Sequence, residues 1–227
     1  MFKLPTSTLV NRKIPKVKFY EKLQANHQLK DLFTHQVDSI VWKHKLSKET
    51  IRLEPKDEIE ELQVFELHLK EESYSLDLLR SIDKSIPYPI LHVLMYEDRV
   101  KLAIAYKERN QANENRSVVR SYHESNWQPK DELQFEIILG LDLKAVYENI
   151  IRKLLTVKAK PEMDLVDVLE RQSQIEKLTQ ECQRLEAKIR TEKQFNRKVD
   201  LNMTLQRKRK ELKRMLKLDT EVNDSYE

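Results

Sequence analysis

The chain has 227 residues, which is enough for one domain of ordinary size and an appendage. Its 42 basic and 38 acidic residues give a net charge of +4, so only local clustering of cations could form a nucleic-acid surface. A single cysteine excludes an internal disulfide, and no stretch approaches the roughly 20 consecutive apolar residues that span a bilayer. We therefore expect a soluble, cytoplasmic protein without membrane contact.

The first half of the chain alternates between helical and strand patterns. Apolar spacing predicts a helix over about 18–33, and alternating apolar and polar residues predict strands at 37–47 and 59–70. Leucines at helical spacing predict a helix at 73–86, which the prolines at 87 and 89 end.

Four more strands and a helix are expected before residue 160. Two apolar runs around the polar turn "EDR" predict a hairpin within 89–108, and strands follow at 117–127 and 133–140. A helix is expected over 142–157, with Asp142 as its cap. This order favours an α+β domain over residues 1–160, with a mostly antiparallel sheet and flanking helices, over a doubly wound fold.

Residues 161–227 form a second part, which we expect to be a helical, coiled-coil arm. No proline or glycine follows Pro161, and from about Asp164 apolar residues recur with a period of seven. The apolar stripe then continues in a shifted register through Phe195, Val199, Leu205, Leu212 and Leu216. A dimeric coiled coil, a single helix and a hairpin bent near "VDLN" (199–202) all fit this pattern.

The heptad positions define a seam that would expose apolar surface unless it were covered. We expect it to bind a second copy of the chain or another subunit. The seam residues are Ile175, Leu178, Cys182, Leu185 and Ile189.

The segment "LQRKRKELKRML" near the end of the arm is strongly basic. Cations favoured by the helix dipole explain only a few of its charges, whereas contact with phosphates explains all of them. No aromatic or amide side chain accompanies these cations to recognise base edges, so we expect contact with the backbone alone. The expected nucleic-acid-binding residues are Arg207, Lys208, Arg209, Lys210, Lys213, Arg214 and Lys217.

The strand at 59–70 ends in "HLK", which raises the alternative of a divergent metal-dependent nuclease. Nucleases of the restriction-endonuclease superfamily place a carboxylate two residues before a lysine on such a strand. Asp38, Glu58, Glu66 and Lys70 would then surround a metal, but the carboxylate position is occupied by His68, a poor Mg²⁺ ligand. We therefore assign no catalytic residue, no metal ligand and no cofactor. The single glycine likewise disfavours a glycine-rich phosphate loop.

Several short motifs in order resemble the bacterial family known as domain of unknown function 4391. They are "IPKVKFY", "VDSIVWKHKLSKETIRL", "IDKSIPYPILHVL" and the ending from Trp127 through Leu133 to Gly140. The likeness covers roughly residues 4–158 and, more loosely, the tail. It implies an accessory gene beside DNA methyltransferase and helicase genes in restriction-like or phage-defence clusters. No site residue transfers from it.

The expected function is therefore a non-catalytic scaffold subunit of such an assembly. Its partners would be DNA methyltransferase and helicase subunits, or a second copy through the arm, with nucleic acid left open as a further partner. A free-standing nucleic-acid-binding protein stays a third interpretation.

Overall fold

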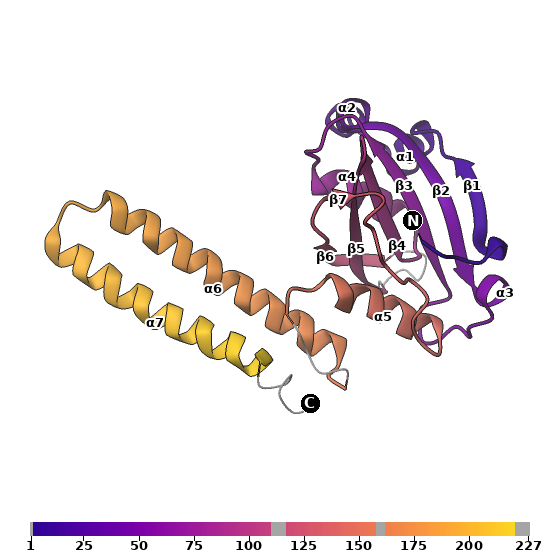
Figure 1. Ribbon diagram of the computed structural model, residues 1–227. Helices are drawn as coiled ribbons and strands as arrows, with labels where there is room; N and C mark the ends of the chain where they lie inside the picture. Colours follow the sequence, from indigo (N-terminus) through magenta and orange to yellow (C-terminus); the bar gives the residue numbers. More distant parts are fainter. Residues whose placement is uncertain (1, 110–116, 158–161, 221–227) are drawn as a thin grey trace. The chain divides into compact units, whose positions relative to one another are not determined.

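A computed structural model describes residues 2–109, 117–157 and 162–220. The chain divides into two compact units, Met1–Leu154 and Leu155–Glu227. We call them the α+β unit and the arm (Figure 1).

One mixed sheet forms the centre of the α+β unit. Its order is β1-β2-β3-β4-β5-β6, and β7 pairs with β5. The parallel pair is β3 with β4, which α4 connects, while the other described pairs are antiparallel. The mostly antiparallel α+β fold expected from the sequence is confirmed. The strands are β1 (Leu9–Lys13), β2 (Val37–Ser47), β3 (Glu61–Leu69), β4 (Ile90–Tyr96), β5 (Arg99–Arg109), β6 (Ser117–Glu124) and β7 (Gln128–Pro129).

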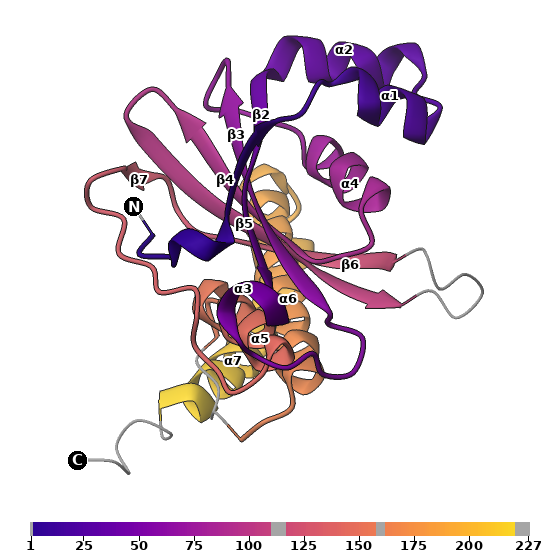
Figure 2. The same ribbon diagram turned by 90° about the vertical axis from the view of Figure 1, so that its right-hand side faces the viewer.

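Helices cover both faces of this sheet (Figure 2). On one face, α1, α2 and α4 bury Phe33, Leu79 and Ile82 completely against the strands. On the other face, α5 contacts β3, β5 and β6 and buries Val146 and Ile150. The helices are α1 (Val17–Leu23), α2 (His27–Gln36), α3 (Lys48–Ile51), α4 (Leu76–Ser85) and α5 (Leu143–Leu154), preceded by the 3₁₀ turn Thr6–Thr8.

The single helix expected at 18–33 is two helices in the structure. The chain leaves α1 at Gln24, whose φ of 48° lies in the left-handed region. Asn26 then begins α2, because its side chain accepts a hydrogen bond from the backbone N–H of Leu29 at 2.9 Å. Glycine or asparagine usually takes the left-handed conformation at a helix end. Because glutamine stands here instead, the end of α1 carries no such signal in the sequence.

The prediction of a strand at 133–140 is wrong. This segment has no regular secondary structure, and side chains of α5 satisfy part of its backbone instead of a neighbouring strand. Lys153 Nζ donates to the carbonyl of Glu136 at 2.7 Å, and Asn149 Nδ2 donates to that of Leu139 at 2.8 Å. The expected cap of α5 is confirmed, since Asp142 Oδ1 accepts from the N–H of Ala145 at 2.7 Å.

The arm is an antiparallel hairpin of α6 (Leu165–Thr191) and α7 (Phe195–Thr220). Contacts near the open end and further toward the turn fix this direction: Arg171 donates to the carbonyl of Met215 at 2.7 Å, and Lys208 lies 2.9 Å from Glu181. The turn falls at 192–194 rather than at 199–202, which is helical. Glu192 leaves the helix in an extended conformation, and its Oε1 accepts from the N–H of Gln194 at 2.9 Å.

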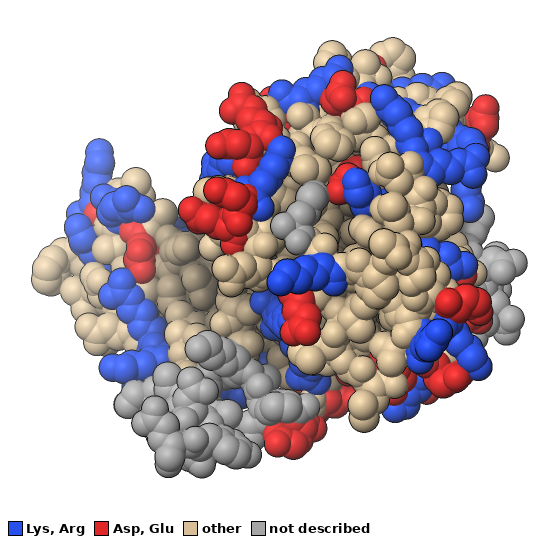
Figure 3. Space-filling view, turned by 45° about the vertical axis from the view of Figure 1, so that its right-hand side comes forward, with Lys and Arg blue, Asp and Glu red and all other residues tan. Residues whose placement is uncertain are grey.

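Charge is distributed unevenly over the α+β unit. Basic and acidic side chains are interspersed over much of the face that Figure 3 shows, as the near balance of the composition requires. Basic side chains predominate at the upper right of that view.

None of the described helices is long and apolar enough to cross a membrane.

Candidate functional site

The hairpin gives most of the expected seam a partner inside the chain. Ile175, Leu178 and Cys182 are only 5–8% exposed, while Leu185 and Ile189 are half-buried. Leu205 of α7, which the sequence placed on the same apolar stripe, is 6% exposed. A second chain could pair with this seam only if α7 moved away, and assignment of the five residues to a partner surface stays a prediction.

Two of the seven expected phosphate-binding cations are used to hold the hairpin together. Lys208 Nζ lies 2.9 Å from Glu181, and Arg209 lies 2.9 Å from Glu186, both on α6. The hydrogen bond with Glu181 raises the pKa of Lys208. These two cations already have carboxylate partners and would have to leave them to bind phosphate.

The other described cations of the segment lie on the opposite side of α7. Arg207, Lys210, Lys213 and Arg214 are exposed, and at about 100° per residue they fall within an arc of about 120° that excludes Leu205 and Leu212. In the described part of the arm, no ion pair involves these four. The backbone of Lys217 continues the arc, but its side chain lies outside the described residues.

Exposed apolar residues precede these cations on the same side of α7. Phe195, Val199 and Met203 are 78%, 40% and 54% exposed, and their spacing of four residues places them along one side of the helix. The prediction that Phe195 and Val199 continue the buried stripe is wrong, because a new helix begins at Phe195 after the turn and both side chains are exposed. Together these three apolar residues and the four cations form a surface that we call the outer face of α7: Phe195, Val199, Met203, Arg207, Lys210, Lys213 and Arg214.

The proposed nuclease residues have other contacts. Asp38 and Glu58 are exposed, whereas Glu66 is 6% exposed and lies 3.3 Å from Lys43. Lys70 Nζ donates to the carbonyl of Thr34 at 2.8 Å. Among the described residues, no three His, Cys, Asp or Glu side chains lie close enough together to hold a metal ion. The geometry gives the nuclease alternative no support.

A buried ionic cluster that the sequence analysis missed lies between α4 and the sheet. Asp83 of α4 is fully buried, with Oδ1 2.9 Å from Lys107 Nζ on β5 and Oδ2 2.9 Å from His92 Nε2 on β4. The hydroxyl of Tyr122 on β6 donates to the same Oδ2 at 2.5 Å. His92 is thus a hydrogen-bonded core histidine, with Nε2 carrying the proton because a carboxylate can only accept.

The cluster is charged, and its charges set the backbone path after α4. Burial alone would raise the pKa of Asp83, but Lys107 and His92 outweigh it and lower the pKa to about 2. Burial lowers the pKa of Lys107, which Asp83 opposes. The three protons of the ammonium go to the carbonyls of Asp83, Ile86 and Tyr88 at 3.1, 3.0 and 2.8 Å. Residues 83–88 are therefore held by a single lysine.

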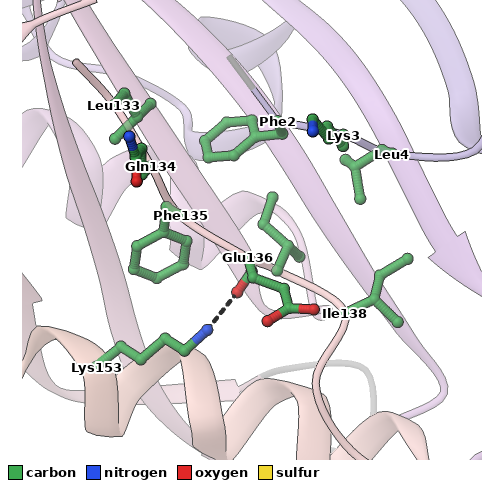
Figure 4. A pocket seen from close by; sticks show the side chains of 10 residues that line it. Phe2, Lys3, Leu4, Leu133, Gln134, Phe135, Glu136, Ile138 and Lys153 are labelled. Atoms are coloured by element: carbon green, nitrogen blue, oxygen red, sulfur yellow. Dashed lines mark hydrogen bonds between the residues drawn. The ribbon is translucent and has the colours of Figure 1, made fainter.

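A cavity of about 810 Å³ lies where the N-terminal residues meet segment 133–138 (Figure 4). Lys153 Nζ lies 5.3 Å from the ring centre of Phe135, and the ring of Phe2 meets Phe135 edge-on at 6.4 Å. The lysine head already donates to the carbonyl of Glu136. Lys153 and the two phenylalanine rings thus help to hold segment 133–138, which has no neighbouring strand to pair with.

Comparison with known proteins places the chain in one family. The model of the family described as domain of unknown function (DUF4391) matches residues 2–212, which include the sheet and nearly all of the helical hairpin. Searches of the curated proteins and of the solved structures gave no match. Because the match covers most of the chain, the protein belongs to the DUF4391 family.

Proposed function

We propose that the chain is a non-catalytic accessory subunit of a bacterial DNA methyltransferase and helicase assembly, and that the outer face of α7 is its contact surface. The association with methyltransferases and helicases is what the family resemblance implies. The outer face is the observation that carries the binding role: three exposed apolar residues followed by four exposed cations on one side of a helix.

The two halves of this face suit different partners. Phe195, Val199 and Met203 would contact a protein subunit, since exposed apolar side chains in a row are typical of such surfaces. Arg207, Lys210, Lys213 and Arg214 would contact phosphates, which requires charge but no base recognition. We also propose that α6 and α7 pack as an antiparallel coiled coil, supported by the heptad spacing of the three buried seam residues.

The hairpin provides a matched pair of variants to test the phosphate contact. Lys210→Gln with Arg214→Gln removes two unpaired cations from the outer face, and Lys208→Gln with Arg209→Gln removes two that are paired with α6. Fluorescence anisotropy with a labelled duplex should show about 30-fold weaker binding for the first variant, because the two lost phosphate contacts, at roughly 1 kcal/mol each, together cost about 2 kcal/mol.

The second variant should bind with an affinity within about twofold of the native chain, because its cations are already paired. Equal losses in both variants would mean that net charge alone, and not the outer face, attracts DNA. Undetectable DNA binding by the native chain would remove the phosphate half of the proposal. A pull-down that compares the native chain with the variant Phe195→Ser, Met203→Ser would then test the apolar half alone. The variant should retain less of the methyltransferase or helicase subunits than the native chain does.

A further inference from the structure

A cavity of about 490 Å³ opens in the α+β unit on the face of the sheet that α1, α2 and α4 cover. Its floor is formed by β2 and β3, and its walls by the end of β1, by α1 and by residues 85–88 after α4. The volume lies within the usual range for small-molecule sites, about 300–1,000 Å³. The α7 helix contributes nothing to this cavity.

Four exposed cations surround the cavity: Arg12, Lys13, Lys18 and Lys22. In the described residues no ion pair involves any of them, whereas four lysines elsewhere in the unit each have a carboxylate partner: Lys43, Lys45, Lys48 and Lys56. Lys18 and Lys22 are four residues apart on α1, where like charges repel each other and destabilise the helix. Their positive charge is therefore free to attract an anion.

Aromatic side chains lie beside these cations. Trp42 and Phe65 face each other across β2 and β3, and both line the cavity together with Tyr88. Arg12 of β1 is the register partner of Trp42 of β2, so the two side chains leave the sheet next to each other. A bulge between Leu9 and Arg12 shifts the register of β1 before this pair. Aromatic faces next to cations are the usual means of holding a base and its phosphate.

Gln63, which lines the cavity, has a buried hydrogen-bond acceptor without a partner among the described residues. Its side chain lines the cavity and is only 3% exposed, yet Oε1 has no hydrogen-bond partner among the described residues. Its Nε2 donates to Glu61 at 2.8 Å, which fixes the orientation of the amide. Glu61 in turn is neutralised by Lys45 at 2.6 Å. A buried carbonyl oxygen of this kind costs stability unless a ligand N–H reaches it.

The wall at 85–88 is held in place by the buried cluster. Lys107 binds the carbonyls of Ile86 and Tyr88, and the same two residues line the cavity. This wall of the cavity is thus anchored to the core, and a ligand would contact it without reshaping the backbone at 85–88.

We propose that this cavity binds a nucleoside phosphate, with the base against Trp42, a base N–H donated to Gln63 Oε1, and the phosphate held by Arg12, Lys13, Lys18 and Lys22. A free mononucleotide and one nucleotide of a single strand share this chemistry. The proposal is independent of the contact proposed for α7, because the two surfaces share no residue.

Tryptophan fluorescence can test the proposal directly. Trp127→Phe leaves Trp42 as the single tryptophan of the chain. Adenosine and thymidine 5′-monophosphates and a five-nucleotide single-stranded DNA should each quench it in a saturable way, and calorimetry should give the same affinities. A single strand that binds more than about tenfold tighter than the monophosphates would assign the cavity to a strand, and equal affinities would assign it to free nucleotides.

Two further variants and a second anion separate charge from base recognition. Lys18→Gln with Lys22→Gln should weaken binding about tenfold, whereas Lys30→Gln with Lys130→Gln, the same charge change at residues that do not line the cavity, should leave it unchanged. Gln63→Leu should weaken nucleotide binding but not binding of inorganic pyrophosphate. Absence of both quenching and binding heat would overturn the proposal, as would pyrophosphate binding as tightly as the nucleotides.

Discussion

The two units of the chain use charge in opposite ways. In the α+β unit, Asp83 and Lys107 are almost entirely buried, and the backbone after α4 is arranged around them. In the arm, Lys208 and Arg209 make ion pairs with Glu181 and Glu186 of α6. The four side chains of these pairs are 35–60% exposed. Buried charges determine the shape of the first unit, whereas the charges of the second lie at its surface, where Lys208 and Arg209 join the two helices and the cations of the outer face have no ion-pair partner in the described arm.

This difference predicts where substitutions of charged residues destabilise the chain. A buried charge that loses its partner keeps its full cost of desolvation, whereas an exposed charge is still solvated by water. Both tryptophans lie in the α+β unit, so tryptophan fluorescence follows unfolding of that unit and leaves the arm to be followed by helicity.

Lys107→Met should have the largest effect on stability. It leaves the carboxylate of Asp83 buried beside His92 and Tyr122 without its cation, which costs about 3–5 kcal/mol of unfolding free energy. Urea denaturation followed by tryptophan fluorescence measures it. The double variant Asp83→Asn with Lys107→Met should recover part of the loss, and a single variant as stable as the native chain would show that the cluster is not ionised.

Gly140→Ala should destabilise the α+β unit by about 2 kcal/mol or more. The new Cβ would lie 2.7 Å from Cβ of Ala145 and 2.8 Å from the backbone N of Val146, and the φ of 148° strains any other residue. In the arm, the exposed Ala187→Gly should cost only about 1 kcal/mol, as an exposed helical position does. Thermal unfolding of the two variants checks the order, and a smaller effect at position 140 would reverse it.

Acid should weaken the α+β unit through Asp83. Its pKa is lowered from 3.8 to about 2 in the folded state, so its contribution is fully present above about pH 4 and is lost as the pH falls toward 2. The loss amounts to about 2 kcal/mol. Unfolding free energies of the native chain and of Asp83→Asn with Lys107→Met should converge over this range. Parallel curves would contradict the assignment.

The smallest effect is expected for the ion pairs of the arm. Glu181→Gln should change the stability of the hairpin by less than about 1 kcal/mol, because the pair of Glu181 with Lys208 is largely exposed. Helicity at 222 nm during thermal unfolding measures it. A loss comparable to that of Lys107→Met would remove the distinction between the two units.

The sequence predicted the elements whose pattern is local. Strand β2 was predicted with its observed bounds, and the hairpin of β4 and β5 was predicted at its place in the chain, since the apolar pattern is visible within each segment. The α5 cap was predicted because Asp142 directly precedes the helix. Segment 133–140 has an apolar pattern typical of a strand, but its backbone is satisfied by Lys153 and Asn149, which no local pattern reveals.

The site was only partly predictable for the same reason. The basic segment of α7 was identified from composition, but its division into paired and unpaired cations depends on α6, twenty or more residues earlier. The turn at 192–194 contains no proline or glycine, so the sequence left the hairpin among three alternatives. Asp83, His92 and Lys107 come from three elements and share no motif, which hid the cluster entirely.

The salt dependence of DNA binding tests most directly whether the outer face of α7 contacts phosphates. If Arg207, Lys210, Lys213 and Arg214 each bind one phosphate, the log–log slope of affinity against salt concentration should be about −3.6, at about 0.9 per contact. Replacing Lys210, Lys213 and Arg214 with Gln should reduce the slope to about −0.9 for every duplex sequence. An unchanged slope in that variant would contradict the account and assign the outer face to protein contact instead.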